Sequence, residues 1–421
     1  MTTKMLILIQ LIVVILIGCG KEGLPDPPPC TNCPDTTNLV VWQHDLDTLT
    51  GEESLFGDPL LYKGNPIFMI FDQWDCQFGS ANRVTCLDAE TGQKLWGFDV
   101  DDPCTTIENG YVYEDVLVLN LSQELAGYNL ITRSKIWSVP FISPMQGSKG
   151  FTGIGNKVYL SVTYGSPPFE PIAGLIEVDI VSGKSRELIR YEKSTWNAYP
   201  KIHPPSLWVN AENGDSTLLI ALGLYEDPTI PSKARHSLHS YNISSSSFSW
   251  SVDSLGIPSN NLKRVEVNDN KVYLLTDYRV HCFNVLDGKK LWETIIPCCT
   301  QFVSIFLNSR VLAVDGKVLV NPSTDNLYCL DANTGEILWE VPEYTATANQ
   351  DLLEYNGVIY LSSFGYGMLV GIDLETGEVL MKETSPNVDP SFSAQNVIVN
   401  PEKNLLFVND FKSAFAYRPV R

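Results

Sequence analysis

Short apolar runs separated by Gly, Asn and Asp recur along the chain, and no stretch shows a helical period. In these runs apolar positions alternate with others, which is the pattern of half-buried β-strands. The sequence therefore predicts an all-β protein. The eight runs begin at residues 67 (IFMIF), 116 (VLVLN), 157 (KVYLSV), 217 (TLLIAL), 271 (KVYLLT), 317 (KVLVN), 357 (GVIYLS) and 405 (LLFVN).

Seven of the runs are followed by variants of one motif, which is clearest in TCLDAETGQKLW at residues 85–96. An Asp or Asn anchors each copy, and the steps between anchors are 41, 50, 63, 42, 47 and 42 residues. Such a period is typical of propeller blades or solenoid units. The anchoring residues are Asp88, Asn129, Asp179, Asn242, Asn284, Asp331 and Asp373.

The motif describes two strands joined by a tight turn. Asp and Thr side chains can bond turn backbone groups, and Gly92, Gly335 and Gly377 supply a positive φ. The second strand ends in Trp, which is too large to stay exposed, so we expect it to wedge between successive blades. The position two residues before the anchor is mostly small, as a crowded contact requires. The repeated Asp residues are therefore interpreted as structural rather than catalytic.

The pattern small-x-Asp-x-x-Thr-Gly-x-x-x-Trp resembles the tryptophan-docking repeat of the pyrroloquinoline-quinone-like β-propellers, and it covers nearly everything after residue 38. This resemblance implies a fold rather than an activity. The family includes quinoprotein dehydrogenases and non-enzymatic lipoproteins such as the outer-membrane assembly factor BamB.

The two ends of the repeat region are each incomplete. The strand LVVWQHDL (39–46) carries Trp42 without a preceding turn motif, whereas residues 404–420 offer two strands and no Trp strand. We expect them to complete one blade together, because this removes exposed sheet edges. Residues 38–421 are thus predicted to form an eight-bladed β-propeller closed by strands from both termini.

The N-terminal residues indicate export. Residues 1–18 contain Lys4, an apolar run over 5–17 and Gly18, which is a signal-peptide pattern too short to span a bilayer. LIGC at residues 16–19 resembles a lipobox, so Cys19 is predicted to be lipidated; the alternative is an ordinary buried Cys after a signal peptide. Residues 19–37, rich in Gly, Pro and charge, are predicted to be a flexible tether.

Ten cysteines suit an oxidising compartment. Cys30 and Cys33 form a CxxC without the His of a haem site, so a local disulfide or two idle thiols are expected. Cys76 and Cys104 are expected to pair, because their loops should emerge as neighbours on one face. A further group occupies the same small motif position on separate blades and is expected to be free: Cys86, Cys282 and Cys329.

The adjacent Cys298 and Cys299 are similar to the vicinal disulfide of some quinoprotein dehydrogenases, although surface thiols or a loop disulfide would also explain them. No segment matches the calcium ligands or catalytic Asp of those enzymes. Neither pyrroloquinoline quinone nor calcium is therefore expected. The five His residues are scattered, and His236 and His239 face opposite sides of a strand, so no metal site is predicted.

Other features bear on partners. The formal net charge of −20 disfavours nucleic acid, and it disfavours contact with an anionic leaflet through a basic patch. The longest step contains residues 191–216, interpreted as an insertion outside the blades that carries Trp196, Tyr199, His203 and Trp208.

Aromatic residues recur where the predicted inner strands end. They are Trp74, Tyr164, Tyr225, Tyr278, Phe364, Tyr366 and Phe411. Nearby acids would complete a rim around the channel mouth that stacks on sugars or grips a basic peptide; these are Asp72, Asp75, Glu226, Asp227, Asp277 and Asp410. The alternative is that the rings fill gaps between blades.

These features favour a monomeric, lipid-anchored, non-catalytic propeller resembling BamB. It would act as a protein-binding or assembly scaffold at the outer membrane, on the periplasmic side or at the cell surface. Envelope or surface proteins, or a glycan, are the expected partners. The alternatives are a quinoprotein dehydrogenase and a cell-surface protein that binds glycans or peptides.

Overall fold

The computed structural model describes the greater part of one compact unit, Pro34–Arg421, as strands and turns without a helix. The described residues are 39–46, 55–71, 82–100, 110–121, 124–140, 150–164, 172–192, 199–225, 234–256, 265–276, 279–297, 309–322, 326–342, 351–363, 368–385, 396–410 and 412–421. Within these ranges no helix is long and apolar enough to cross a membrane. The predicted signal peptide and tether lie outside them.

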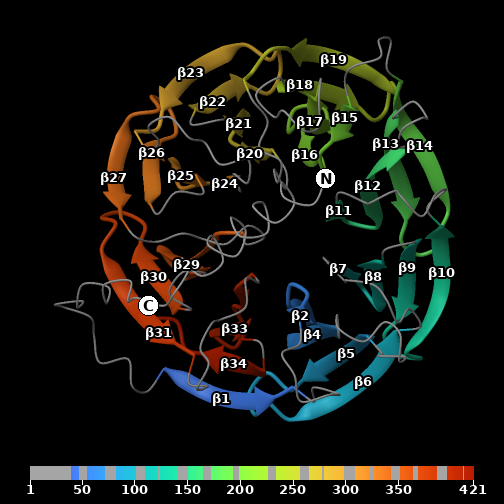
Figure 1. The fold of residues 1–421 in the computed structure, drawn as a ribbon, viewed down its shortest axis with the longest axis vertical. Helices are drawn as coiled ribbons and strands as arrows, with labels where there is room; N and C mark the ends of the chain where they lie inside the picture. The colour runs from blue at the N-terminus through green and yellow to red at the C-terminus, as the bar shows by residue number, and fades with distance from the viewer. Residues whose placement is uncertain are drawn as a thin grey trace, which may run out of the picture. The chain divides into compact units, whose positions relative to one another are not determined.

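Eight antiparallel sheets follow one another around a closed ring (Figure 1). Each contains four main strands, from the innermost to the outermost, so each sheet is one blade of a propeller. The prediction of an all-β, eight-bladed propeller is confirmed. All eight apolar runs form the second strand of a blade.

Blades 1 and 4 each carry one additional short strand, whereas blades 2 and 3 have four strands. In blade 1 both β2 and β3 pair with β4, and in blade 4 both β15 and β16 pair with β17. The strands of blades 1 and 2 are β2 (Leu55–Phe56), β3 (Leu60–Tyr62), β4 (Asn65–Phe71), β5 (Asn82–Leu87), β6 (Lys94–Val100), β7 (Gly110–Tyr113), β8 (Val116–Asn120), β9 (Glu124–Asn129) and β10 (Ser134–Pro140). Those of blades 3 and 4 are β11 (Phe151–Ile154), β12 (Lys157–Tyr164), β13 (Ile172–Asp179), β14 (Ser185–Glu192), β15 (Tyr199–Ile202), β16 (Ser206–Val209), β17 (Ser216–Tyr225), β18 (Ala234–Asn242) and β19 (Ser247–Val252).

Blades 5 to 7 have four strands each. Blade 5 contains β20 (Glu266–Asn268), β21 (Lys271–Thr276), β22 (Arg279–Asn284) and β23 (Lys290–Ile295). Blades 6 and 7 contain β24 (Ser309–Val314), β25 (Lys317–Pro322), β26 (Leu327–Asp331), β27 (Ile337–Val341), β28 (Leu353–Tyr355), β29 (Val358–Ser363), β30 (Met368–Asp373) and β31 (Val379–Thr384).

Blade 8 joins the two ends of the described chain, as predicted. It contains β32 (Ile398–Asn400), β33 (Leu405–Asn409), β34 (Ser413–Tyr417) and, as the outermost strand, β1 (Val40–Asp45). β1 pairs antiparallel with β34, with Trp42 opposite Ala416. Strands distant in sequence thereby close the ring through backbone hydrogen bonds.

Strand direction divides the connections between two faces. Because the four strands of a blade alternate in direction, the inner hairpins of the eight blades and the outer turn motifs of blades 1 to 7 lie on one face, which we call the turn face. The loops between the second and third strands, and the connections between blades, lie on the opposite face. Most residues outside the described ranges belong to those loops and connections.

The apolar core lies between neighbouring blades. One cluster combines Ile67 and Met69 of blade 1 with Leu117 and Leu119 of blade 2, and the other clusters likewise combine side chains from adjacent blades. Stacked sheets bury both faces of each blade, which explains why the second and third strands are almost continuously buried.

The interpretation of residues 191–216 as an insertion is wrong for its described part. Tyr199 lies on β15 and Trp208 on β16, and both strands pair with β17 as the innermost layer of blade 4. His203 is buried between them. The longer step arises because this innermost layer is split into two short strands; Trp196 lies outside the described residues.

Candidate functional site

Repeated Trp residues join five of the eight blades to the next one in the ring through hydrogen bonds. The indole Nε1 of Trp292 on β23 donates to the carbonyl of Ala332 in the turn of blade 6, at 3.1 Å. In every case the acceptor directly follows an anchoring Asp or Asn. The equivalent bonds are Trp42 to Ala89, Trp137 to Ile180, Trp250 to Val285 and Trp339 to Leu374, at 2.7–3.2 Å. The predicted wedging of Trp between blades is confirmed.

The motif Gly has a second task that the sequence did not reveal. Gly335 has a φ of +76°, and a Cβ placed on it would lie 2.6 Å from the Trp292 ring. The same approach occurs at four other blade junctions: Gly92 with Trp42, Gly183 with Trp137, Gly288 with Trp250 and Gly377 with Trp339. The absence of a side chain therefore makes room for the neighbouring Trp as well as permitting the turn.

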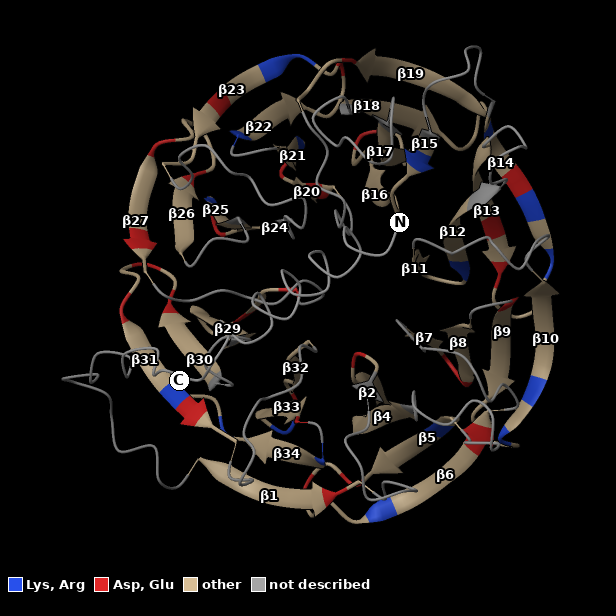
Figure 2. Ribbon diagram, viewed as in Figure 1, with Lys and Arg blue, Asp and Glu red and all other residues tan. Residues whose placement is uncertain are grey.

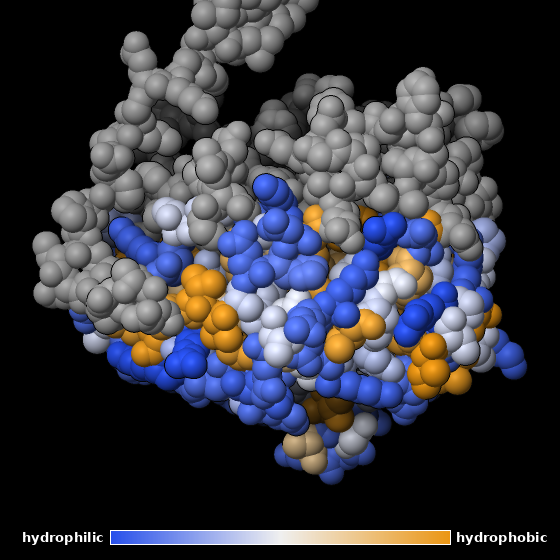
Figure 3. Space-filling view, turned by 90° about the horizontal axis from the view of Figure 1, so that it is seen from below, coloured by the Kyte–Doolittle hydropathy of each residue, from blue (hydrophilic) through white to orange (hydrophobic). Residues whose placement is uncertain are grey.

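A β-bulge sets the direction of each Trp. The pairing register shifts at the residue before Trp96, Trp137, Trp250, Trp292 and Trp339. The bulged residue is turned to solvent, which accounts for the exposed Leu95, Ile136, Leu291 and Leu338. On the wall that carries β1 and β6, apolar areas interrupt the hydrophilic surface (Figure 3).

The anchoring carboxylates bond their own turns. Asp88 Oδ1 accepts hydrogen bonds from the backbone N–H and the hydroxyl of Thr91, both at 2.8 Å. Hydrogen bonds from the Thr91 hydroxyl and from the backbone N–H groups of Thr91 and Glu90 hold the pKa of Asp88 below its usual value. Asp331 and Asp373 bond Thr334 and Thr376 in the same way. These contacts support the interpretation of the repeated Asp as structural.

Three junctions depart from the pattern, and at one of them, between blades 7 and 8, Met381 stands in place of the Trp. Arg133 takes the place of the motif Gly in blade 2, and its guanidinium lies 5.9 Å from the Trp96 ring, within the range of a cation–π contact. Blade 3 has no Trp. There Arg186 forms a two-point ion pair with Glu177, which stands at the normally small position, and Tyr241 of blade 4 donates to the Leu188 carbonyl.

Most of the predicted partner-binding residues lie outside the described part of the chain, namely Trp74, Tyr278, Phe364, Tyr366 and Phe411. Tyr164 and Tyr225 are the last residues of β12 and β17, at the ends opposite the turn face. Asp410 was expected on the acidic rim, and this is wrong. Only 3% of it is exposed, because its carboxylate accepts hydrogen bonds from the Ser385 hydroxyl and from the backbone of Lys412 and Ser413.

Three cysteines fall within the described ranges, and all are free and buried: Cys86, Cys282 and Cys329. Burial raises the pKa of each thiol to about 12, so each is a small core residue rather than a nucleophile. The expectation that they are unpaired is confirmed. Cys19, Cys30, Cys33, Cys76, Cys104, Cys298 and Cys299 lie outside the described residues, and their states stay predictions.

Blade 5 holds a hydroxyl, an imidazole and a carboxylate in line. His281 Nε2 lies 2.7 Å from Thr276 Oγ1, and its Nδ1 lies 3.3 Å from Glu293 Oε2. This is the order of a nucleophilic triad, but Thr276 is fully buried and donates its proton to the Leu255 carbonyl. His281 therefore donates to the hydroxyl and cannot receive its proton. These contacts link β21, β22 and β23 to one another and, through the Leu255 carbonyl, to the connection between blades 4 and 5.

Sequence reasoning missed this contact because the register of β21, β22 and β23 brings its members together. One signal was present, since His239 and His281 both stand three residues before an anchoring Asn. His239 bonds Ser237 through Nε2 and Ser251 through Nδ1, at 2.7 and 2.8 Å. Both histidines thus serve as polar cross-links between strands.

His236 has a different environment. It is fully buried on β18, its ring centroid lies 5.4 Å from that of His203, and neither ring nitrogen has a hydrogen-bond partner in the described part of the chain. Burial lowers the pKa of His236 to about 3, and the nearby Lys201 and His281 act in the same direction. The imidazole is therefore neutral at pH 7. Its opposite orientation from His239 agrees with the predicted alternation.

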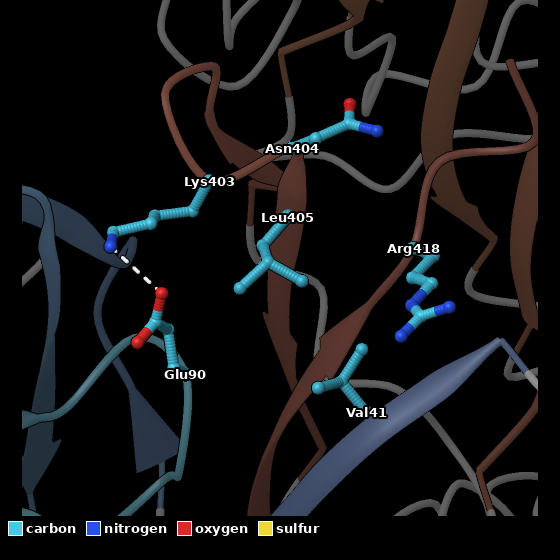
Figure 4. Close-up of a pocket in the computed structure, with 6 residues that line it drawn as sticks. All are labelled: Val41, Glu90, Lys403, Asn404, Leu405 and Arg418. Atoms are coloured by element: carbon cyan, nitrogen blue, oxygen red, sulfur yellow. Dashed lines mark hydrogen bonds and ion pairs between the residues drawn. The ribbon is translucent and has the colours of Figure 1, made fainter.

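A pocket of about 410 Å³ lies on the turn face where blade 8 meets blade 1 (Figure 4). Its lining residues are Val41, Glu90, Lys403, Asn404, Leu405 and Arg418. Lys403 Nζ lies 2.8 Å from Glu90 Oε1, and this hydrogen bond raises the pKa of Lys403. The exposed Arg418 points toward Val41. The pocket is open and charged, and its cations could receive a small carboxylate.

A second pocket, of about 570 Å³, lies between the inner hairpins of blades 1 and 2. Lys63 Nζ forms an ion pair across this pocket with Asp115 Oδ1 at 2.7 Å, and the Tyr62 hydroxyl donates a hydrogen bond to the same oxygen. Among the described residues, no group of three or more His, Cys, Asp or Glu is placed to hold a metal ion.

Comparison with known proteins agrees with this geometry. Residues 277–410 match the family model of the outer membrane protein assembly factor BamB. No curated protein matches in sequence.

Solved structures share the fold at low sequence identity. BamB from Moraxella catarrhalis is 13% identical with a TM-score of 0.59, and the match covers 90% of this chain and 99% of that one. Saccharomyces cerevisiae Sqt1 is 9% identical with a TM-score of 0.63 over the same shares. The computationally designed Ika8 protein is 12% identical with a TM-score of 0.60, over 88% of this chain and 98% of that one. The chain therefore has a β-propeller fold, and residues 277–410 resemble the BamB family.

Proposed function

We propose that this protein is a lipid-anchored, non-catalytic β-propeller that acts as a protein-binding or assembly scaffold in the bacterial cell envelope. The match of residues 277–410 to the BamB family model carries the proposal, since it favours the scaffold branch of a fold that also serves enzymes. The LIGC sequence at residues 16–19 supplies the anchor. The scaffold role requires neither quinone nor calcium.

The face opposite the turns is the proposed partner-binding face. Tyr164 and Tyr225 end their strands there, and the other predicted rim aromatics follow equivalent strands in sequence. Aromatic side chains on loops held by a rigid ring supply contact area at low entropic cost. Envelope proteins are the proposed partners.

Changing Tyr278, Phe364 and Phe411 together to Ala should abolish capture of envelope partners while leaving the melting temperature almost unchanged. Capture is measured by crosslinking in cells, purification and identification of the copurified proteins. Tyr355→Ala, on the opposite face, should retain the same partners. If the triple variant instead loses ~3–5 kcal/mol of stability for each ring, the aromatics fill gaps between blades and the proposed site is wrong.

Lipidation is tested separately at Cys19. Cells fed labelled palmitate should incorporate the label into the wild-type protein, and Cys19→Ser should abolish both the label and partition into a detergent phase, because the thiol is the acylation site. Cys30→Ser should remain labelled. Equal labelling of the wild type and Cys19→Ser would refute the anchor without bearing on partner capture.

A further inference from the structure

The outer turns of blades 2, 3 and 5 differ from those of blades 1, 6 and 7 at their tips. Ile131, Val181 and Leu286 stand two residues after the anchoring residue and are 63%, 59% and 58% exposed. These are the highest exposures among the large apolar side chains of the described residues. The same position holds Glu90, Asn333 and Glu375 in blades 1, 6 and 7. An apolar side chain at the tip of a solvent-exposed turn has no folding role.

Blade 4 continues this apolar series. Its turn tip is Ser244, but Phe248, at the start of β19 and next to the outer turn, is 51% exposed. Blades 2 to 5 follow one another around the ring (Figure 1). We call these four side chains the apolar half-ring: Ile131, Val181, Phe248 and Leu286.

The charged residues of the outer turns also differ between blades 2 to 5 and blades 1, 6 and 7. The turn segments 131–135, 181–185, 244–248 and 286–290 contain five Lys or Arg and one Asp, whereas 90–94, 333–337 and 375–379 contain one Lys and four Glu. Arg133, Lys184 and Lys289 are exposed beside the apolar tips. In Figure 2 the outer strand β10 carries only basic residues and β27 only acidic ones, whereas β14, β23 and β31 carry both signs, so the division lies in the turns rather than in the strands. A chain of net charge −20 therefore presents a locally basic rim.

We propose that the apolar half-ring docks the propeller onto an anionic lipid surface. Single apolar side chains flanked by Lys and Arg are the combination that binds the interface of an anionic bilayer. The turn tips Ile131, Val181 and Leu286 are aliphatic rather than aromatic, and charged turn residues separate them, so they do not form the contiguous apolar centre of a protein interface. A fluid headgroup layer accommodates separated tips individually.

Acidic residues nearer the axis restrict the contact. The inner hairpins of blades 2 and 4 carry Glu114, Asp115, Glu212 and Asp215, which an anionic surface repels. The ring must therefore meet the bilayer through its outer rim, tilted toward blades 2 to 5, rather than lying flat. The formal net charge of −20 disfavours contact with an anionic leaflet. This total, however, averages the basic turns of blades 2 to 5 with the acidic turns of blades 1, 6 and 7.

The inference rests on the proposed envelope location, since an acyl chain at Cys19 would keep the ring close to a bilayer. A lipobox Cys carries two acyl chains, which attach the protein stably without a further signal. The half-ring would instead fix the orientation of the propeller on that bilayer. It also leaves the opposite face, where partners are proposed to bind, directed away from the membrane.

The test uses residues 34–421, which contain the complete closed ring and lack Cys19, so acylation cannot contribute. Vesicles of phosphatidylethanolamine with phosphatidylglycerol should sediment the protein, and phosphatidylcholine vesicles should not. The variant I131S/V181S/L286S should bind on the order of 100-fold more weakly, about fivefold for each tip. R133Q/K184Q/K289Q should weaken binding similarly and reduce its salt dependence.

The matched control is L95S/I337S/L338S, which removes three apolar side chains of 48%, 38% and 49% exposure from the outer strands of blades 1 and 6, outside the half-ring. It should bind as the unmodified ring does. Absence of binding to the anionic vesicles, or equal losses in the tip and control variants, would overturn the proposal. If the tip variant loses a copurifying envelope protein and vesicle binding is absent, the half-ring is a protein-binding surface and the lipid proposal is wrong; partner capture unchanged by the tip variant leaves the scaffold function standing.

Discussion

Replacing Gly335 by Ala should lower the free energy of unfolding by about 2–5 kcal/mol. The left-handed backbone costs an L-residue about 1–2 kcal/mol, and forcing a methyl group into a packed contact costs about 1–3 kcal/mol more. The new Cβ would lie 2.6 Å from both the Trp292 ring and Thr294 Oγ1. Because Thr294 Oγ1 also donates to the Gly335 carbonyl at 2.7 Å, neither neighbour can move freely. Denaturant unfolding monitored by Trp fluorescence measures the effect.

Gly316 supplies the matched control. Its φ is +72°, almost that of Gly335, but a Cβ placed on it would meet nothing within 4 Å. Gly316→Ala should therefore cost only the backbone term, about 1–2 kcal/mol. Equal losses at the two positions would show that the motif Gly serves its turn alone and that Trp packing on the next blade contributes nothing.

Comparison of these two variants separates the two roles of the motif Gly, which are to adopt the positive φ of the turn and to leave room for the neighbouring Trp. In a ring of blades each junction is repeated, so a cost at one junction is transmitted only to its neighbours. The difference between Gly335→Ala and Gly316→Ala then estimates how strongly one junction holds the ring together. The Trp292 junction is a suitable choice, because Trp292 is only 9% exposed.

Acidification should destabilise the propeller between pH 6.5 and 4.5, and His236 should cause a large part of the loss. Burial lowers the pKa of His236 to about 3 in the folded protein, against an ordinary value of 6.5. The unfolded chain therefore binds more protons throughout this window. Unfolding becomes more favourable as the pH falls, by up to about 1.4 kcal/mol per pH unit for this group, or about 2–3 kcal/mol in all.

Structural carboxylates act in a lower range. Hydrogen bonds from Lys157 and Ser182 lower the pKa of Asp179 to about 2, and those from Lys290 and Arg279 lower the pKa of Glu293 to about 2. Such groups lose their stabilising charge only as the pH falls through and below about 4. Above pH 4.5 the histidines dominate the pH dependence, and His239 and His281, whose pKa values burial also lowers, contribute with the same sign.

His236→Leu isolates the contribution of this residue. Neither ring nitrogen of His236 has a hydrogen-bond partner in the described structure, so an apolar side chain of similar volume should leave stability at pH 7 within about 1.5 kcal/mol. The loss between pH 6.5 and 4.5 should shrink by about 2–3 kcal/mol. Urea unfolding at a series of pH values measures both quantities. An unchanged pH dependence in a folded variant would contradict the assignment.

Local periodicity was sufficient to establish the architecture. Eight alternating runs, the recurrence of Asp, Gly and Trp, and the complementary defects at Trp42 and at residues 404–420 predicted eight blades and their closure. These features are visible in the sequence because each blade repeats the same strand–turn–strand unit. A repeated unit requires similar residues at equivalent positions, so the pattern recurs. The free cysteines followed from the same logic, since one position on separate blades cannot form a disulfide.

Contacts between blades were decided only by the tertiary structure. The packing of Trp292 on Gly335, the burial of Asp410, the inclusion of β15 and β16 in blade 4 and the alignment of Thr276, His281 and Glu293 all depend on strand register or on the neighbouring blade. The separation of apolar and basic turns from acidic ones depends on which blades adjoin around the ring. A linear sequence records the type of each residue, but only the closed ring determines which residues share a face, because that follows from the direction and order of strands distant along the chain.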